Sequence, residues 1–143
     1  MISSSAMLGP CAMTIDVTSA VLEAMLTEAR AAHPREVCGL LFGSEAWIVS
    51  LQPATNVHPT PETHFEIDPQ ALVDAHRAMR TGGPRLVGYY HSHPFGEPVP
   101  STTDIALAAG DGMIWAIIGR ARVTFWRAGD DGMTALPYRL AGA

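Results

Sequence analysis

The chain of 143 residues has little of what marks several large classes of protein. It contains two cysteines, Cys11 and Cys38, which are too few for a disulfide framework, so we expect a protein of the reducing cytoplasm. Its net charge of −5 argues against the basic face that proteins binding nucleic acids carry. No run of 18 apolar residues is present to span a membrane, and the first residues lack the cationic start of a secretory signal.

The composition that remains fits one folded domain of the mixed α/β class. Hydrophobic residues make up 48% of the chain, which is enough for a sizeable core at this length. Residues 1–15 carry no charge and show no clear period, so we predict a flexible N-terminal leader there. Residues 16–143 are predicted to form the domain, with a central mixed β-sheet flanked by helices.

Two segments have the apolar spacing of amphipathic helices. The first is predicted to start with Asp16 or Thr18 as its cap and to end near Ala32. The second starts after Asp68 and reaches about Arg80, where two glycines stop it. Apolar, β-branched and aromatic content predicts strands at residues 38–43, 46–51, 64–67, 85–91, 113–119, 121–129 and 133–140.

The segment from Tyr90 to Asp104 is the most informative part of the chain. His91 and His93 stand two residues apart where a predicted strand ends, so their side chains are expected to point the same way. Three prolines and a glycine then force a turn, after which Ser101 is predicted to cap a helix with Asp104 in its first turn. A strand end facing a helix start could therefore bring three ligands together.

Two histidines and a carboxylate are typical ligands of catalytic zinc. Zinc in hydrolases usually takes three protein ligands and keeps a fourth position for water, which it makes acidic enough to attack a carbonyl near neutral pH. The alternative is that the histidines are half-buried strand residues and Asp104 is only the acidic partner of a helix cap. A second motif upstream favours the zinc site.

That second motif lies in residues 33–43, which read HPREVCGLLFG. It has the spacing E-X-C-G-X-L-X-G, filled by Glu36, Cys38, Gly39, Leu41 and Gly43. Downstream, the His-X-His pair is followed by ten residues and then the aspartate, with a serine three positions before it. Together the two motifs resemble the JAMM metallopeptidase family, also called MPN+, and the resemblance covers most of the chain.

The resemblance implies a zinc ion held by His91, His93 and Asp104, with Glu36 and Ser101 at the positions of the family's glutamate and serine. A carboxylate that is not a ligand suits the general base, which takes a proton from water and returns it to the leaving amine. The Ser101 hydroxyl could donate to the developing oxyanion and also cap its helix. Taken alone, Glu36 could instead be an exposed charge at the end of a turn.

Other polar and aromatic residues are expected to have no part in the centre. His58 and His64 flank a proline-rich loop without ligand spacing, and we interpret them as loop residues or contacts in a substrate groove. Cys38 lies in an apolar run where a thiol tends to be inert, so a Cys-His protease is not favoured. Trp115 and Trp126 are interpreted as packing residues of their strands.

The resemblance also implies a substrate. JAMM enzymes similar to this chain cleave the amide bond after the C-terminal Gly-Gly of ubiquitin or of a ubiquitin-like β-grasp protein, often an isopeptide bond to lysine. Only eight residues separate Asp104 from the strand at Met113, so the long second insertion of the eukaryotic deubiquitinases is missing. The chain is in this respect more similar to the compact bacterial and archaeal members.

Two alternatives to this activity remain open. The chain could be a non-catalytic scaffold of the same fold, or a zinc amidase that acts on a small amide or a short peptide adduct. The filled motif positions favour an enzyme over a scaffold, because a scaffold has no physical need for an open three-ligand site. The identity of the modifier and the oligomeric state are left open by the sequence.

Overall fold

An eight-stranded mixed sheet forms the body of the molecule in the computed structural model, which describes residues 13–108 and 110–142. In spatial order the strands are β7 (Gly132–Leu136), β6 (Arg122–Gly129), β5 (Ile114–Gly119), β4 (Leu86–Ser92), β2 (Cys38–Ser44), β3 (Trp47–Ala54), β1 (Ile15–Val17) and β8 (Tyr138–Leu140). The helices are α2 (Ser19–Ala32), α3 (Pro69–Arg80) and α4 (Thr102–Ala108). None of these three helices is both long and apolar enough to cross a membrane.

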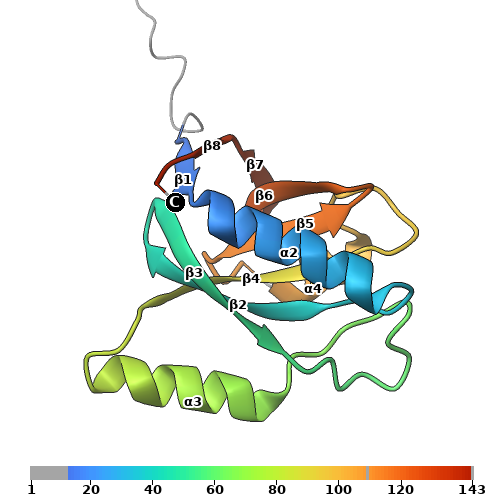
Figure 1. The fold of residues 1–143 in the computed structure, drawn as a ribbon, viewed down its shortest axis with the longest axis horizontal. Coiled ribbons are helices and arrows are strands. Elements are labelled where there is room, and N and C mark those ends of the chain that lie inside the picture. The colour runs from blue at the N-terminus through green and yellow to red at the C-terminus, as the bar shows by residue number, and fades with distance from the viewer. Residues whose placement is uncertain (1–12, 109, 143) are drawn as a thin grey trace, which may run out of the picture.

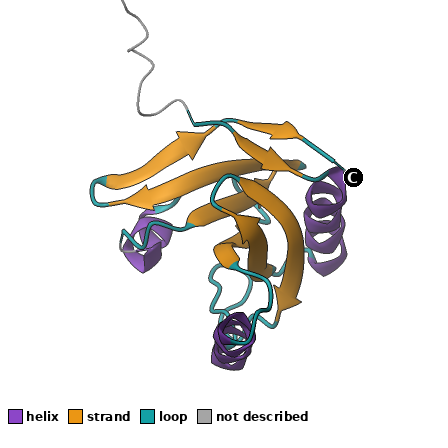
Figure 2. Ribbon diagram, turned by 90° about the vertical axis from the view of Figure 1, so that its left-hand side faces the viewer, coloured by secondary structure: helices purple, strands orange, loops and turns teal. Residues whose placement is uncertain are grey.

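The sheet is strongly curved, and helices cover both of its faces (Figures 1 and 2). Helix α2 crosses one face, where it contacts β3, β5 and β6, while α4 lies on the opposite side and α3 packs beside β4. The pairs β1–β3, β1–β8 and β4–β5 are parallel, and the other pairs are antiparallel. The prediction of a mixed α/β fold with a central sheet flanked by helices is confirmed.

Both predicted long helices are present. Helix α2 follows Thr18, whose side chain accepts a hydrogen bond from the backbone N–H of Val21 at 3.2 Å. The interpretation of Asp16 as a cap is wrong, because Asp16 lies in β1 and its carboxylate pairs with Arg139 of β8. Helix α3 is capped by Asp68, as the sequence predicts.

Most of the predicted strands are confirmed. Strands β2 and β3 form the expected antiparallel hairpin, and β4, β5 and β6 cover the expected segments. The segment 133–140 is not one strand, because it divides at Pro137 into β7, which pairs with β6, and β8, which pairs with β1. Proline has no N–H with which to continue a ladder, so the division at this residue has a simple cause.

Strand β1 was not expected from the sequence. Residues 1–12 of the predicted leader lie outside the described residues, but Ile15 is already the first residue of β1. Ile15 and Val17 are fully buried between β3 and β8. A strand of three residues is too short to show a period, and its partners come later in the chain, so the sequence did not indicate that Ile15 belongs to the sheet.

The strand expected at 64–67 is absent, and this prediction is wrong. Only an isolated antiparallel bridge between Asn56 and Ile67 forms there. The backbone groups on both sides of Phe65 hydrogen-bond to the side chain of Asn56 instead of to a strand. Phe65 itself is buried, so its apolar character reflects packing rather than a place in the sheet.

Strand β4 runs through the middle of the sheet between β2 and β5 and ends at the candidate site. Its residues Tyr90 and His91 are fully buried. Gly39 of β2 is the cross-strand partner of Tyr90, and the tyrosine ring lies over it while the tyrosine hydroxyl donates to Glu28 of α2. A side chain at residue 39 would occupy the space that this ring fills.

We therefore expect Gly39→Ala to destabilise the fold. The added Cβ would overlap the ring of Tyr90, which is buried and hydrogen-bonded and so has little room to move. Overpacking of this kind typically costs about 1–3 kcal/mol, which urea unfolding would measure. Gly129→Ala is the control, because a Cβ there would meet the carbonyl oxygen of Gly132 at an ordinary contact distance of 3.6 Å. Equal stability of the two variants would contradict the packing argument.

Candidate metal centre

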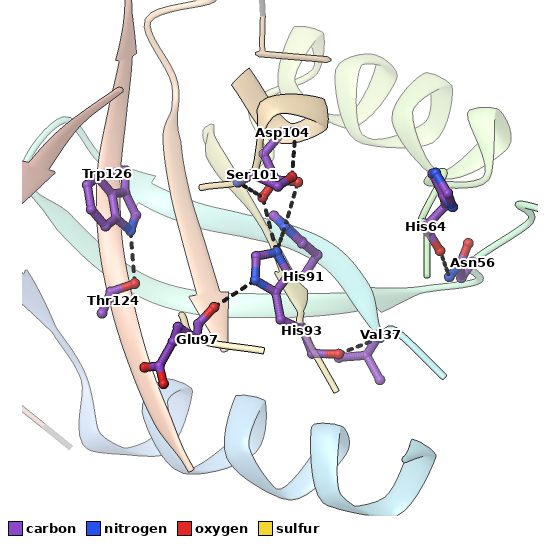
Figure 3. A network of polar contacts seen from close by, with 11 residues as sticks. Val37, Asn56, His64, His91, His93, Glu97, Ser101, Asp104, Thr124 and Trp126 are labelled. Carbon is purple, nitrogen blue, oxygen red and sulfur yellow. Dashed lines mark hydrogen bonds and ion pairs between the residues drawn. The ribbon is translucent and has the colours of Figure 1, made fainter. Parts of the chain in front are cut away.

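Three side chains converge where β4 ends and α4 begins. The Nε2 atoms of His91 and His93 lie 3.2 Å apart, which confirms that the two side chains point the same way. His91 Nε2 is 3.0 Å from Oδ1 of Asp104, and His93 Nε2 is 3.1 Å from Oδ2 (Figure 3). One ligand atom from each residue lies within 4.8 Å of the others, which suits a single metal ion.

Hydrogen bonds at the start of α4 hold the carboxylate of Asp104 in position. The Ser101 hydroxyl accepts a hydrogen bond from the backbone N–H of Asp104, and the Asp104 carboxylate accepts one from the N–H of Ser101, both at 3.0 Å. This reciprocal arrangement is a capping box, so the helix cap read from the sequence is present. The cap and the ligand cluster use the same carboxylate, so Asp104 can be both the acidic partner of a helix cap and a candidate metal ligand.

The donor set fits a metal ion of the zinc type. Burial lowers the pKa of His91, so this imidazole is neutral, while burial of Asp104 is outweighed by its contacts with His91 and His93, which hold the pKa of the carboxyl below its ordinary range. The Nδ1 of His93 donates to the carbonyl oxygen of Glu97 at 2.8 Å, which leaves its Nε2 lone pair directed at the cluster. Burial of His93 is outweighed by its hydrogen bonds to Asp104 and to the carbonyl oxygen of Glu97, which raise its pKa. Two imidazoles and one carboxylate are ligands that zinc accepts, and a bound cation would displace the proton from His93.

Aromatic packing supports the His91 ring in addition to the contact of its Nε2 with Asp104. Its Nδ1 is buried and makes no hydrogen bond within the described part of the chain. The ring of Phe65 stacks on it at a centroid distance of 4.3 Å and an angle of 17°, and Trp115 meets it edge-on at 5.9 Å. The interpretation of Trp115 as a packing residue holds, but what it packs against is a candidate ligand.

The loop that follows His93 is held by the β5–β6 hairpin. Arg120 forms an ion pair with Glu97 at 2.7 Å, and the hydroxyl of Thr124 donates to the carbonyl oxygen of Pro98. Trp126 in turn donates to Thr124 at 2.8 Å (Figure 3). No local pattern predicts these contacts, because the Thr124 hydroxyl and its acceptor are 26 residues apart.

Glu36 lies in the connection that enters β2 and is buried, so the exposed-charge interpretation is wrong. Burial raises the pKa of its carboxyl from the ordinary value of 4.5 to about 7, with His93 lowering this pKa and Asp104 raising it. Glu36 is not one of the three clustered ligands, but the charges of two of them act on it. Its side chain lines a cavity of about 460 Å³ together with Arg35 and Asn56.

The remaining candidates behave as the sequence suggests. Burial raises the pKa of the Cys38 thiol to about 12, which makes it a poor nucleophile. His58 and His64 stack on each other at 4.7 Å and contact Thr60, and neither is part of the three-residue cluster.

Two grooves are lined by a candidate ligand or by the aromatic residues that pack on one. One, of about 190 Å³, is lined by His93, His33 and Arg120 among others, at the end of α2 and the β5–β6 turn. The other, of about 490 Å³ and mostly apolar, includes the two aromatic residues that contact His91, Phe65 and Trp115.

Comparison with known proteins gives a consistent result. The family described as prokaryotic homologs of the JAB domain matches residues 18–129. A desampylase from Haloferax volcanii is 36% identical over 107 residues, which are 73% of this chain and 77% of that protein. A probable TtuB-protein conjugate cleaving protease from Thermus thermophilus is 37% identical over 71% of this chain and 61% of its own length. A CysO-cysteine peptidase from Mycobacterium bovis is 37% identical over 62% of this chain and 61% of its own length.

Solved structures agree with the fold. A protein from Desulfitobacterium hafniense superimposes with a TM-score of 0.79 at 31% identity, covering 91% of this chain and 94% of its own. A JAB1/MPN domain protein from Archaeoglobus fulgidus superimposes with a TM-score of 0.58 at 20% identity, covering 87% of this chain and 98% of its own. The second likeness supports the fold alone.

The geometry predicts about one divalent metal ion per purified chain. His91→Ala or Asp104→Ala should abolish tight binding, since losing one of three donors leaves a site too weak to hold the ion against a chelator. Elemental analysis after dialysis against chelator measures this. His58→Ala is the matched control, because it removes an imidazole outside the cluster and should keep the metal. Full metal content in His91→Ala would show that the ligands are misassigned.

Proposed function

The chain belongs to the family of prokaryotic homologues of the JAB domain, and from this we propose that it is a zinc-dependent peptidase or isopeptidase. Its proposed reaction is hydrolysis of the amide bond after the C-terminal Gly-Gly of a ubiquitin-like β-grasp protein, in a conjugate or a precursor. One observation carries the proposal: two imidazoles and an ionised carboxylate meet at one point, beside a buried glutamate whose pKa lies near neutrality.

His91, His93 and Asp104 would hold the ion. Zinc bound there would acidify a water molecule and polarise the substrate carbonyl. The chain itself contributes the rigidity of the site, because each ligand is fixed by a different support: aromatic stacking for His91, the Glu97 carbonyl for His93 and the capping box for Asp104.

Glu36 is the proposed general base and acid. Its carboxylate would take a proton from the attacking water and later deliver it to the leaving nitrogen. Burial supports this role, because a carboxyl with a pKa near 7 both accepts and releases a proton readily at neutral pH. A cation at the ligand cluster would lower this pKa and so keep Glu36 ionised before the reaction begins.

Ser101 is the proposed donor to the developing oxyanion. Its oxygen accepts the N–H of Asp104 with a lone pair, so its hydroxyl proton is not used in that bond. Ser101 is exposed at the start of α4, next to the ligand it caps. A hydroxyl in this place could donate to the carbonyl oxygen of the substrate as negative charge gathers there.

The proposed substrate follows from the relatives and from the grooves. The relatives described above are named as a desampylase, a conjugate cleaving protease and a CysO-cysteine peptidase. The grooves lined by His93 and by the aromatic residues that pack on His91 give room for a polypeptide near the scissile bond. The likeness to a CysO-cysteine peptidase also favours a second candidate, in which the leaving group is as small as a single amino acid.

We expect Glu36→Gln to keep the metal and the fold and to lose about 10²–10⁴-fold in kcat. The amide is nearly the same size as the carboxyl but takes up no proton. In the unsubstituted protein, activity should fall as the pH decreases below neutrality, because protonation of a carboxyl with a raised pKa removes the base. The acid limb should lie between pH 4.5 and 7, set by how far the bound cation lowers the pKa. Loss of metal in Glu36→Gln would instead identify Glu36 as a ligand.

A second test concerns the substrate tail. Fusions of a ubiquitin-like β-grasp protein to an unrelated protein should be cleaved when the last tail residue is Gly, and roughly tenfold or more slowly when it is Ala or Val. The reason is steric, because only glycine lets the backbone come close to the ligand cluster. Reactions with chelator serve as controls. Equal rates for the three tails, or cleavage of short peptides alone, would favour the small-amide alternative.

A further inference from the structure

We propose that Asn56 is a positioning residue that holds the general base and the aromatic support of His91 in one rigid unit. The inference rests on the proposed function for its meaning, since Glu36 is the base only if the chain is a hydrolase. The observation itself is independent of that function. It concerns the segment 55–67 between β3 and α3, which touches both sides of the candidate centre.

The side-chain amide of Asn56 uses both of its donors and both acceptor positions of its oxygen. Its Nδ2 donates to the carbonyl oxygens of Glu36 and His64, each at 3.0 Å. Its Oδ1 accepts the backbone N–H groups of His58 and Glu66, at 3.1 and 3.0 Å. An amide with four partners of fixed direction has one allowed orientation, so it fixes the groups around it.

On one side, Asn56 holds the base. Glu36 comes before the first β2–β3 pair, Cys38 with Ala54, so the sheet ladder does not fix its backbone. Its carbonyl oxygen accepts from Asn56, and its N–H donates to the carbonyl oxygen of Pro61 in the same segment at 2.7 Å. Both backbone groups of Glu36 are therefore held by residues 56–61.

On the other side, Asn56 holds the residue that orients His91. Its partners His64 and Glu66 are the two neighbours of Phe65 in the chain. Their bonds to one amide fix the backbone on both sides of Phe65, whose ring stacks on His91. One side chain thus connects the backbone of the proposed base to the backbone around the aromatic support of a proposed ligand. It adds to the two hydrogen bonds that join Val37, the residue after Glu36, to Ser92, the residue after His91.

Only a neutral amide of this length can make all four of these hydrogen bonds. Aspartate would keep the two acceptor bonds to His58 and Glu66 but would turn a second oxygen toward the carbonyls of Glu36 and His64. Asn56→Asp therefore removes the two N–H donors of the side chain while keeping the size and shape of that side chain. We expect it to loosen Glu36 while leaving the ligand cluster able to hold metal.

The test compares the full-length chain with Asn56→Asp, using as probe a β-grasp protein that ends in Gly-Gly fused to an unrelated protein. We expect kcat to fall about 10²-fold, the effect of a misplacement of roughly 1 Å, with KM changed less than about twofold and zinc content unchanged. By NMR, the amide hydrogen of Glu36 should exchange at least tenfold faster, while those of His58 and Glu66 keep their protection. Gln52→Glu is the control, because it adds the same charge at an exposed position of β3 and should change none of these values.

The outcomes separate the inference from the proposed function. An unchanged kcat, a loss of zinc, or faster exchange throughout the chain would each overturn the positioning role. Should wild-type protein not cleave the fusion, the proposed function fails, and the exchange rate of the Glu36 amide alone decides whether Asn56 positions that residue. If Asn56→Asp does not fold, Asn56→Ser, which is neutral and shorter, takes its place with the same expected pattern.

Discussion

The carboxylate of Asp104 is the contact on which the candidate centre depends. One oxygen meets His91, and the other meets His93 and the backbone N–H of Ser101. It therefore joins the end of β4 to the start of α4, two elements that are otherwise separated by a proline-rich turn. A buried charge is costly unless it is paired and hydrogen-bonded, and this carboxylate has partners at both oxygens. The same pairing gives the site the negative charge that a metal cation needs.

The two histidines are supported from opposite directions by segments that are far apart in the chain. The loop after His93 is fastened to the β5–β6 hairpin through Arg120 and Thr124. His91 is backed by Phe65, which belongs to the segment after β3. Candidate ligands at the end of a central strand, each held by a separate segment, have few ways to move, which is what a catalytic metal site requires.

Burial of Glu36 carries a cost in stability. Its raised pKa means that the folded state prefers the neutral carboxyl, while the unfolded chain ionises it from about pH 4.5 upward. With no ion bound, the preference of the folded state for the neutral carboxyl contributes to the free energy of unfolding. This contribution is fully present below pH 4.5 and is lost as the pH rises toward 7. A cation in the cluster would reverse part of that loss, so binding of metal and ionisation of the base would assist each other.

The sequence by itself determined the local elements and the identity of the clustered residues. Caps and apolar spacing placed α2 and α3, and the His-X-His pair with its aspartate could be read as ligands because strand alternation and a helix cap are local properties. Only the tertiary structure decided that β1 joins the sheet, that Phe65 stacks on His91 rather than forming a strand, and that Asn56 ties Glu36 to that ring. These features depend on partners tens of residues away, whose approach no periodicity records, and on burial, which changes the pKa of a carboxyl without changing its place in the sequence.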